Sequence, residues 1–269
     1  MIQIYIMKKI FKIMPISIGA LLSMHLALAQ DTAPNITGIW STTETFFEHP
    51  YWTIEELFSC NCTSETYDHL LELLLPENDH LSAQEIEDSV DAYNDAAIAE
   101  LFTQEKIDYL ASYDPADDPS IQCEKFGVIR TVLHNDPILI QQGDAQTVIL
   151  PEDLASDRVI YMDGRGHPEN GQLSALGHSI GWYEGSALVI DTVNISAAIA
   201  DDTLNIHHAD NARFIERYTP NEDGTRLRGQ YTIIDPVMFL EPLTIERTRI
   251  LTPEADLLDA PCETISGEM

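Results

Sequence analysis

The sequence predicts a mainly β fold, either an antiparallel barrel of the lipocalin type or a sandwich, with one helical insertion. Beyond residue 126, short apolar segments alternate with tight turns, a pattern typical of many short strands. A Gly-x-Trp segment at residues 38–40 supplies an earlier strand. Between residues 52 and 112 the apolar residues recur every three or four positions, which indicates helices.

The first strand is expected at residues 37–43, with Gly38 allowing close approach of a neighbour and Trp40 anchoring the core. Ser82 and Glu85 have the Ser-x-x-Glu spacing of a capping box at a helix start. Helices are therefore expected at residues 65–75, 82–101 and 104–113.

These helices would form a strongly acidic insertion at about residues 52–112 of a single domain that spans residues 30–269. The later strands are expected at residues 127–133, 137–142, 146–150, 158–163, 177–184, 187–194, 212–219, 226–234 and 243–251. Turn residues such as Asn, Asp, Gly and Pro separate them. Together with the first strand they suffice to close a barrel or to form a sandwich.

Residues 1–29 match a bacterial secretory signal peptide. A short basic region precedes an apolar run at residues 13–28, and the run ends in an Ala-Leu-Ala cleavage pattern. The basic residues are Lys8, Lys9 and Lys12. The alternative is an uncleaved anchor, but the run is short and interrupted for a membrane span. We therefore expect a periplasmic or secreted protein with no membrane insertion after cleavage.

The chain is strongly acidic, with 45 Asp and Glu against 14 Lys and Arg and a formal net charge of −31. Such a surface repels nucleic acid and anionic lipid, so we expect neither as a partner.

Four cysteines are present: Cys60, Cys62, Cys123 and Cys262. An even number in an exported chain favours disulfides. Because Cys60 and Cys62 are two residues apart, the spacing favours a separate partner for each of them. A bridge between Cys123 and Cys262 is the alternative, since it would tie the start of the β region to the C-terminus. A Cys-x-Cys metal site would need a second pair of ligands, which the sequence does not supply.

Two predicted strands carry polar residues that alternation places on the core face. His178 and Trp182 share one face of their strand, which we expect to be the core face. Glu216 shares a face with Phe214 and Tyr218. A carboxylate among aromatic rings must be hydrogen-bonded, paired or shifted in pKa. Glu216 is therefore either an acid–base group or one half of a structural pair with an arginine.

A Gly-rich loop after the strand at 158–163 carries Asp163, Arg165 and His167. These side chains could converge on a ligand that bears oxygen atoms. The alternative is a loop held by an Asp–Arg pair. Arg213, near the start of the strand expected at residues 212–219, is a candidate for stabilising negative charge.

Two other pairs remain open. His207 and His208 are adjacent, so on an extended segment they face opposite ways and cannot chelate one ion together. A zinc site that includes one of them lacks the usual spacing. Arg247 and Arg249 share a strand face and could reach into a cavity to hold an anion.

Several enzyme signatures are absent, including the phosphate-binding and dinucleotide-binding Gly-rich loops. Residues 177–181 spell Gly-x-Ser-x-Gly, the sequence of a serine-hydrolase elbow. A hairpin rather than a helix is expected after it, so the match does not favour a hydrolase.

Residues 161–168 read Tyr-Met-Asp-Gly-Arg-Gly-His-Pro, 177–181 read Gly-His-Ser-Ile-Gly, and 183–185 read Tyr-Glu-Gly. Over roughly residues 114–264 this run of motifs resembles a large, uncharacterised group of exported bacterial proteins. The resemblance implies an architecture and no particular activity. The group usually has a Trp at the place of Tyr183 and a His at the place of Arg213, so any activity that needs that His is in doubt here.

We expect the barrel to enclose a small, partly apolar molecule, because barrels of about eight strands leave room for one ligand. Two alternatives are an acid–base enzyme of the isomerase, lyase or hydratase type in the same cavity, and an extracytoplasmic interaction module that docks through its acidic helices. No cofactor and no metal is expected, and the oligomeric state is not predicted. The catalytic candidates are His178, Glu216 and Asp163, and the ligand-binding candidates are Arg165, His167, Trp182 and Arg213.

Overall fold

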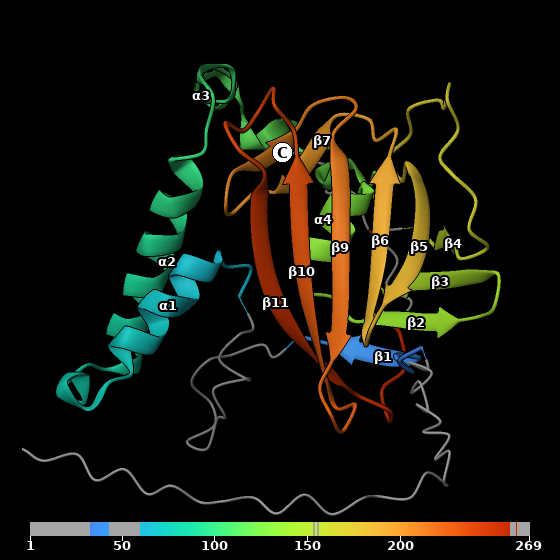
Figure 1. Cartoon of the computed structure of the whole chain (residues 1–269). Coiled ribbons are helices and arrows are strands. Elements are labelled where there is room, and N and C mark those ends of the chain that lie inside the picture. The colour runs from blue at the N-terminus through green and yellow to red at the C-terminus, as the bar shows by residue number, and fades with distance from the viewer. Residues whose placement is uncertain (1–32, 43–59, 153, 155, 259–261, 263–269) are drawn as a thin grey trace, which may run out of the picture. The chain divides into compact units, whose positions relative to one another are not determined.

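A closed barrel dominates the computed structural model, which describes residues 33–42, 60–152, 154, 156–258 and 262 (Figure 1). Nine strands in this part of the chain follow one another around the barrel in the order β1-β11-β10-β9-β6-β5-β4-β3-β2. They are β1 (Gly38–Ser41), β2 (Ile138–Gln142), β3 (Gln146–Pro151), β4 (Arg158–Tyr161), β5 (His178–Glu184), β6 (Ala187–Val193), β9 (Arg213–Pro220), β10 (Arg226–Ile234) and β11 (Leu243–Leu251). The expected mainly β fold is confirmed, and of its two forms it is the barrel.

The barrel closes through its first strand, because β1 pairs with both β11 and β2. All neighbouring strands run antiparallel except β4 and β5, which pair in parallel. The parallel pair follows from the long connection over residues 162–177, which carries the chain back before β5 begins. A purely antiparallel meander, as the turn signals suggested, is therefore wrong at this one place.

Large side chains fill the barrel. Alternate residues of each strand point inward, and those of β9 and β10 include Phe214, Tyr218, Tyr231 and Ile233, each 0% exposed. Trp40 of β1 joins the same core cluster. Its indole N–H donates to Ile36 O at 2.9 Å, which satisfies the buried donor.

The segment expected to be a strand at 127–133 is instead a short helix, α4 (Val128–Leu133), and that prediction is wrong. Five of its six residues are buried (Val128, Ile129, Thr131, Val132 and Leu133), and Figure 1 shows the helix behind the β9 and β10 ribbons. Its Val, Ile and Thr content favours a strand by propensity, but tertiary packing overrides propensity.

Two inward-facing arginines of β11 hold the end of α4. Arg247 donates to Leu133 O at 2.9 Å and to His134 O at 2.8 Å. Arg249 donates to Val132 O at 3.1 Å and to His134 O at 3.0 Å. Cations are favoured at a helix C-terminus, where carbonyl oxygens lack partners within the helix. These arginines therefore bind backbone carbonyls and do not line an anion site.

The helical insertion lies between β1 and α4 in sequence, as expected. It consists of α1 (Ser64–Leu73), α2 (Ala83–Ala99) and α3 (Gln104–Ser112), with short 3₁₀ turns at Pro76–Asn78, Pro115–Asp117 and Pro119–Gln122. The capping box at Ser82 and Glu85 forms as the spacing predicts. In Figure 1 α1 and α2 lie side by side next to β11.

Backbone contacts attach α1 to the barrel wall. Cys62 and Glu246 exchange two backbone hydrogen bonds, at 3.3 and 2.8 Å. The Tyr67 hydroxyl donates to Glu246 O at 2.8 Å. α1 also packs against α2, and a small second core forms around Tyr67, Leu70 and Val90.

A separate two-stranded sheet, not anticipated from the sequence, crosses one end of the barrel. It pairs β7 (Ala198–Asp201) with β8 (Ile206–His208). α4 packs beside β7. Asn205, in the left-handed conformation with φ 54°, makes the turn before β8.

Two disulfides join the four cysteines. Cys123 bonds to Cys262, which confirms the alternative pairing. Cys60 bonds to Cys62, so the preferred separate partners for these two residues are wrong. The Cα atoms of Cys60 and Cys62 are 5.3 Å apart, which lies within ordinary disulfide geometry despite the single residue between them.

The signal-peptide prediction falls on residues 1–29, outside the described residues. Within the described part of the chain, no helix has both the length and the apolar character needed to cross a bilayer.

Candidate functional site

Five of the predicted site residues come together on the outer face of the barrel wall. Asp163, Arg165 and His167 lie in the connection after β4, His178 begins β5, and Arg213 begins β9. They meet because β4, β5, β6 and β9 are consecutive in the barrel. The structure therefore gathers most of the candidate set, but outside the barrel rather than within it.

The two histidines of this outer cluster contact each other directly. Nδ1 of His167 lies 2.9 Å from Nδ1 of His178. One ring must donate and the other accept, so the contact forms only while one Nδ1 is unprotonated. Burial lowers the pKa of His178, and the neighbouring His167 and Arg165 lower it further. The lowered pKa favours the neutral form of His178, which is the form that a general base requires.

Asp191 of β6 completes the outer cluster, and sequence reasoning missed it. Its carboxylate binds Arg213 through two hydrogen bonds of 2.8 and 2.7 Å and lies 3.3 Å from His167 Nε2. Burial favours a higher pKa for Asp191, but the hydrogen bonds and charge of Arg213 outweigh it and the net pKa is lowered. Asp191 alternates with the inward-facing Thr192, and that alternation was the available signal.

Asp163 and Arg165 form the loop-internal pair that was the alternative to ligand binding. Arg165 Nε lies 2.9 Å from Asp163 Oδ1. The Arg165 side-chain hydrogen bonds lower the pKa of Asp163 to about 2. The Arg165 guanidinium also lies 3.9 Å from the centre of the Tyr161 ring, which in turn stacks on His178 at 5.3 Å. Both charges are thus neutralised locally, and neither is held ready for a ligand.

His178 and Trp182 point away from the core, so the predicted face is wrong. In β5 the buried residues are Ser179 and Gly181, while Trp182 is 39% exposed and donates to Glu184 at 2.8 Å. Gly181 has no side chain and packs tightly against Met162 and Ile160. The small inward residues made the outer face look like the more apolar one.

Glu216 lies inside the barrel, at 0% exposure, as alternation predicts. Arg158 binds it through both carboxylate oxygens, at 2.6 and 3.0 Å, and Tyr218 donates to it at 2.8 Å. The remaining donors of Arg158 reach Ser179 at 3.0 Å and Thr192 at 2.6 Å. Glu216 is thus one half of a satisfied structural pair, with no access to a ligand.

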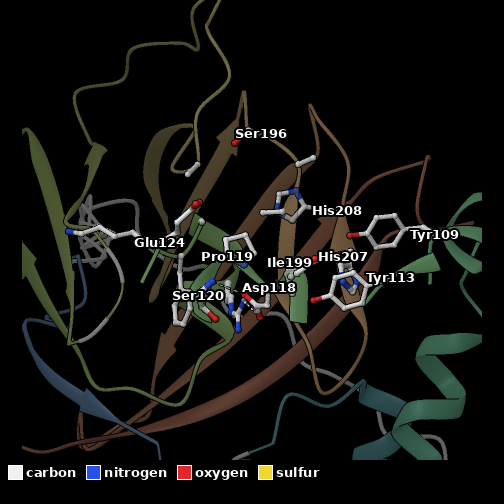
Figure 2. A pocket seen from close by; sticks show the side chains of 18 of the residues that line it. Tyr109, Tyr113, Asp118, Pro119, Ser120, Glu124, Ser196, Ile199, His207 and His208 are labelled. Carbon is white, nitrogen blue, oxygen red and sulfur yellow. Dashed lines mark hydrogen bonds and ion pairs between the residues drawn. The ribbon is translucent and has the colours of Figure 1, made fainter. Parts of the chain in front are cut away.

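A pocket of about 600 Å³ opens at the end of the barrel where α3, the β7–β8 sheet and α4 meet (Figure 2). Its size lies within the range of small-molecule sites. Aromatic, apolar and imidazole side chains form much of its wall, including Tyr109, Tyr113, Phe126, Ile199, His207 and His208. The Asp118–Arg130 ion pair, at 2.8 Å, also lies at this wall.

Three polar atoms of this pocket wall are buried without a hydrogen bond to the described residues. They are Nε2 of His207, Nε2 of His208 and the hydroxyl of Tyr113. Both histidines are 2% exposed. Buried polar atoms are nearly always paired, so three orphans on one wall are unusual.

Lys106 of α3 lies behind His207 and is 0% exposed. Its Nζ is 2.8 Å from His207 Nδ1, 5.3 Å from the centre of the Phe102 ring and 5.7 Å from that of Tyr109. Burial lowers the pKa of Lys106 to about 7, although the charge of Asp235 raises it slightly. Burial, followed by the charge of Lys106, lowers the pKa of His207 to about 4.

Sequence reasoning named His207 and His208 only as poor metal ligands and missed Lys106. The helix at 104–113 did carry a signal, because Lys106, Tyr109 and Tyr113 share one helical face. Among the described residues, no group of three His, Cys, Asp or Glu side chains is arranged to hold a metal ion.

A second pocket, of about 680 Å³, lies at a mouth of the barrel under residues 33–37. Gln142 spans it, donating to Pro34 O and to the Tyr183 hydroxyl, both at 2.9 Å. None of its lining residues has a buried side-chain N or O atom that lacks a hydrogen bond to the described residues, so this pocket has fewer buried unsatisfied groups to offer a ligand than the one in Figure 2.

The fold and these sites define a disulfide-bonded β-barrel with a partly aromatic side pocket. No family model, curated protein or solved structure matches the chain.

Proposed function

We propose that the protein is an exported binder of a small, partly apolar molecule, and that the ligand occupies the pocket of Figure 2 rather than the barrel interior. The observation that carries this proposal is the set of three unpaired polar atoms on the wall of a pocket of about 600 Å³. A ligand with hydrogen-bonding groups would satisfy them and remove the cost of leaving them unpaired.

The chemistry of the wall supports a partly apolar ligand. Tyr109 and Tyr113 stack at 5.8 Å and each meets the His207 ring edge-on, at 4.9 and 4.8 Å. Phe126 and Ile199 add apolar surface. Rigid aromatic side chains give large contact area at low entropic cost, with the polar atoms fixing orientation.

Two disulfides support an oxidising compartment, because such bonds persist outside the cytoplasm. The resemblance to exported bacterial proteins and the predicted signal peptide point the same way. The interior of the barrel favours a structural role, since Arg158, Glu216 and the aromatic residues of β9 and β10 occupy it.

The test is native mass spectrometry of the protein purified gently from its exported fraction, in wild-type form and as Tyr113→Phe. Wild type is expected to carry a co-purifying small molecule, and Tyr113→Phe to carry at least about fivefold less, since one hydrogen bond contributes about 1 kcal/mol. Tyr93→Phe is the matched control, because Tyr93 lies on α2 and stacks on His69.

Equal ligand occupancy in Tyr113→Phe and Tyr93→Phe would place the ligand elsewhere. A wild-type protein free of any small molecule, both as purified and after incubation with an extract of its own exported fraction, would remove the binding function.

A further inference from the structure

We propose that the pocket of Figure 2 takes a ligand bearing a carboxylate. His207 donates a hydrogen bond to this carboxylate, and Lys106, on the other side of the imidazole ring, is the positive charge that the carboxylate compensates. This inference rests on the proposed function, because it names the ligand class for the same pocket. Its main observation is the burial of Lys106.

Lys106 is a fully buried amine that no described carboxylate pairs with. Buried lysines are almost always paired, since an isolated buried charge is costly. No ion pair joins Lys106 to Asp or Glu in the described residues, and the one hydrogen-bond partner of its side chain there is His207. Asp235 is the carboxylate whose charge Lys106 senses. That carboxylate already accepts from the backbone N–H groups of Ala209, at 2.6 Å, and Val237, at 3.0 Å.

The contact with Lys106 decides which nitrogen of His207 carries the proton. A charged lysine nitrogen can only donate, so Nδ1 of His207 accepts from it at 2.8 Å. The carbonyl of Asn205 lies further away, at 3.3 Å. Neutral His207 then carries its proton on Nε2, the atom that lacks a partner. The pocket wall therefore presents an N–H donor that needs an acceptor.

A carboxylate supplies both the acceptor that His207 Nε2 lacks and the negative charge that Lys106 lacks. Its oxygen accepts from His207 Nε2, and its charge compensates Lys106 through the imidazole. Tyr113, which meets the same histidine ring at 4.8 Å, offers its unpaired hydroxyl to the second oxygen. Charge-assisted hydrogen bonds of this kind are about twice as strong as neutral ones.

The other charged groups nearby do not supply this charge. Asp118 is held by both oxygens on Arg130, at 2.9 and 2.8 Å. Burial lowers the pKa of His208, which favours its neutral form. Its Nδ1 lies 3.3 Å from Ala209 O, a carbonyl that can only accept, so its Nε2 is a bare acceptor. An N–H or O–H elsewhere on the ligand would satisfy that atom.

Binding of such a ligand is coupled to a proton. The pKa of Lys106 is lowered to about 7 in the free protein, and a neighbouring carboxylate raises it. The ligand therefore binds with uptake of a proton at pH above 7, and its affinity falls as the pH rises through that value.

The experiment uses three probes that share one ring and differ in the polar group: benzoate, benzamide and benzylamine. Binding to the full chain is followed by NMR of the histidine side chains. Benzoate is expected to bind most tightly and to weaken about tenfold from pH 6 to pH 8, as linkage to one proton requires. Benzamide binding is expected to be nearly independent of pH.

Lys106→Met is expected to abolish the pH dependence of benzoate binding and to weaken it at pH 6. Arg217→Met is the control, since it removes an equal charge from the barrel wall, where Arg217 pairs with Glu184 at 2.7 Å. In the free wild type, the histidine spectra should also show His207 protonated at Nε2.

The outcomes separate the two proposals. Preference for benzylamine or benzamide, or benzoate binding that Lys106→Met leaves unchanged, overturns the carboxylate inference while the pocket remains a binding site. Failure of all three probes to perturb the signals of His207 or His208 contradicts the inference, and together with a ligand-free native mass spectrum it removes the proposed function as well.

Discussion

The pair of Arg158 and Glu216 is the residue-scale feature with the clearest energetic consequence. Both are almost completely buried, and the contact is bidentate. Breaking a buried pair by removing one partner leaves an uncompensated charge and typically costs about 3–5 kcal/mol. Glu216→Gln should therefore lower the free energy of unfolding by about that amount. Urea denaturation followed by tryptophan fluorescence, to which buried Trp40 contributes, measures it.

The double replacement Arg158→Met with Glu216→Met provides the internal control. Well-packed apolar side chains can substitute for a buried ion pair at little cost. The double variant should be more stable than Glu216→Gln. A double variant that is the less stable of the two would show that the hydrogen bonds of Arg158 to Ser179 and Thr192 matter more than the charge balance.

The sequence identified candidate polar residues better than it predicted which face of a strand each one occupies. Alternation in β9 correctly placed Glu216 inside, because Phe214 and Tyr218 share its face. It misplaced His178, because the inward positions of β5 are the small residues Ser179 and Gly181. Small residues face inward in β5 because a large side chain of the neighbouring strand, Arg158, fills the space beside them. The sequence of β5 alone carries no information about that side chain.

At the scale of elements, the two disulfides differ in the length of chain that each of them closes into a loop. Cys123 and Cys262 are 139 residues apart, whereas Cys60 and Cys62 are 2 apart. In the chain-entropy account, closing the long loop contributes about 5 kcal/mol and closing the short one about 1–2 kcal/mol. Replacing Cys123 and Cys262 by Ser should therefore destabilise the barrel much more than replacing Cys60 and Cys62. Urea denaturation of both double variants tests this.

The short disulfide has a local role in this account. Cys62 exchanges backbone hydrogen bonds with Glu246 and so fixes the start of α1 on β11. Its loss should increase amide exchange in α1 while β10 stays protected. Equal losses of stability from the two replacements would contradict the assignment.

Elements with a strong internal period were predictable, and those defined by packing were not. The capping box marked the start of α2, and turn residues marked most strands. α4 escaped prediction because four of its six residues favour strands, yet the segment forms a helix whose last carbonyls bind Arg247 and Arg249. β7 and β8 escaped because strands of four and three residues carry too little pattern. The pocket was not predicted either, since α4 and the β7–β8 sheet form part of its wall.

Charge is the property that belongs to the whole molecule. The formal net charge is −31, and Lys106 is the one Lys or Arg between Ser64 and Ser112. Because Lys106 is buried, the surface of α1, α2 and α3 carries acidic side chains with no Lys or Arg among them. Self-repulsion of like charges destabilises a compact state, and salt screens it.

The crowding is greatest along α2, where Asp88, Asp91 and Asp95 are three or four residues apart and so share one side of the helix. Burial raises the pKa of Asp91, and the charges of Asp95 and Asp88 raise it further. We expect the free energy of unfolding to rise from about 0.02 M to about 0.5 M NaCl, since the screening length falls to a few ångströms. Asp91→Asn should stabilise the protein at low salt and reduce its response to salt. Urea denaturation across this salt range measures both effects, with sucrose as an uncharged control. If Asp91→Asn responds to salt as wild type does, the repulsion is spread over the whole surface and is not concentrated on α2.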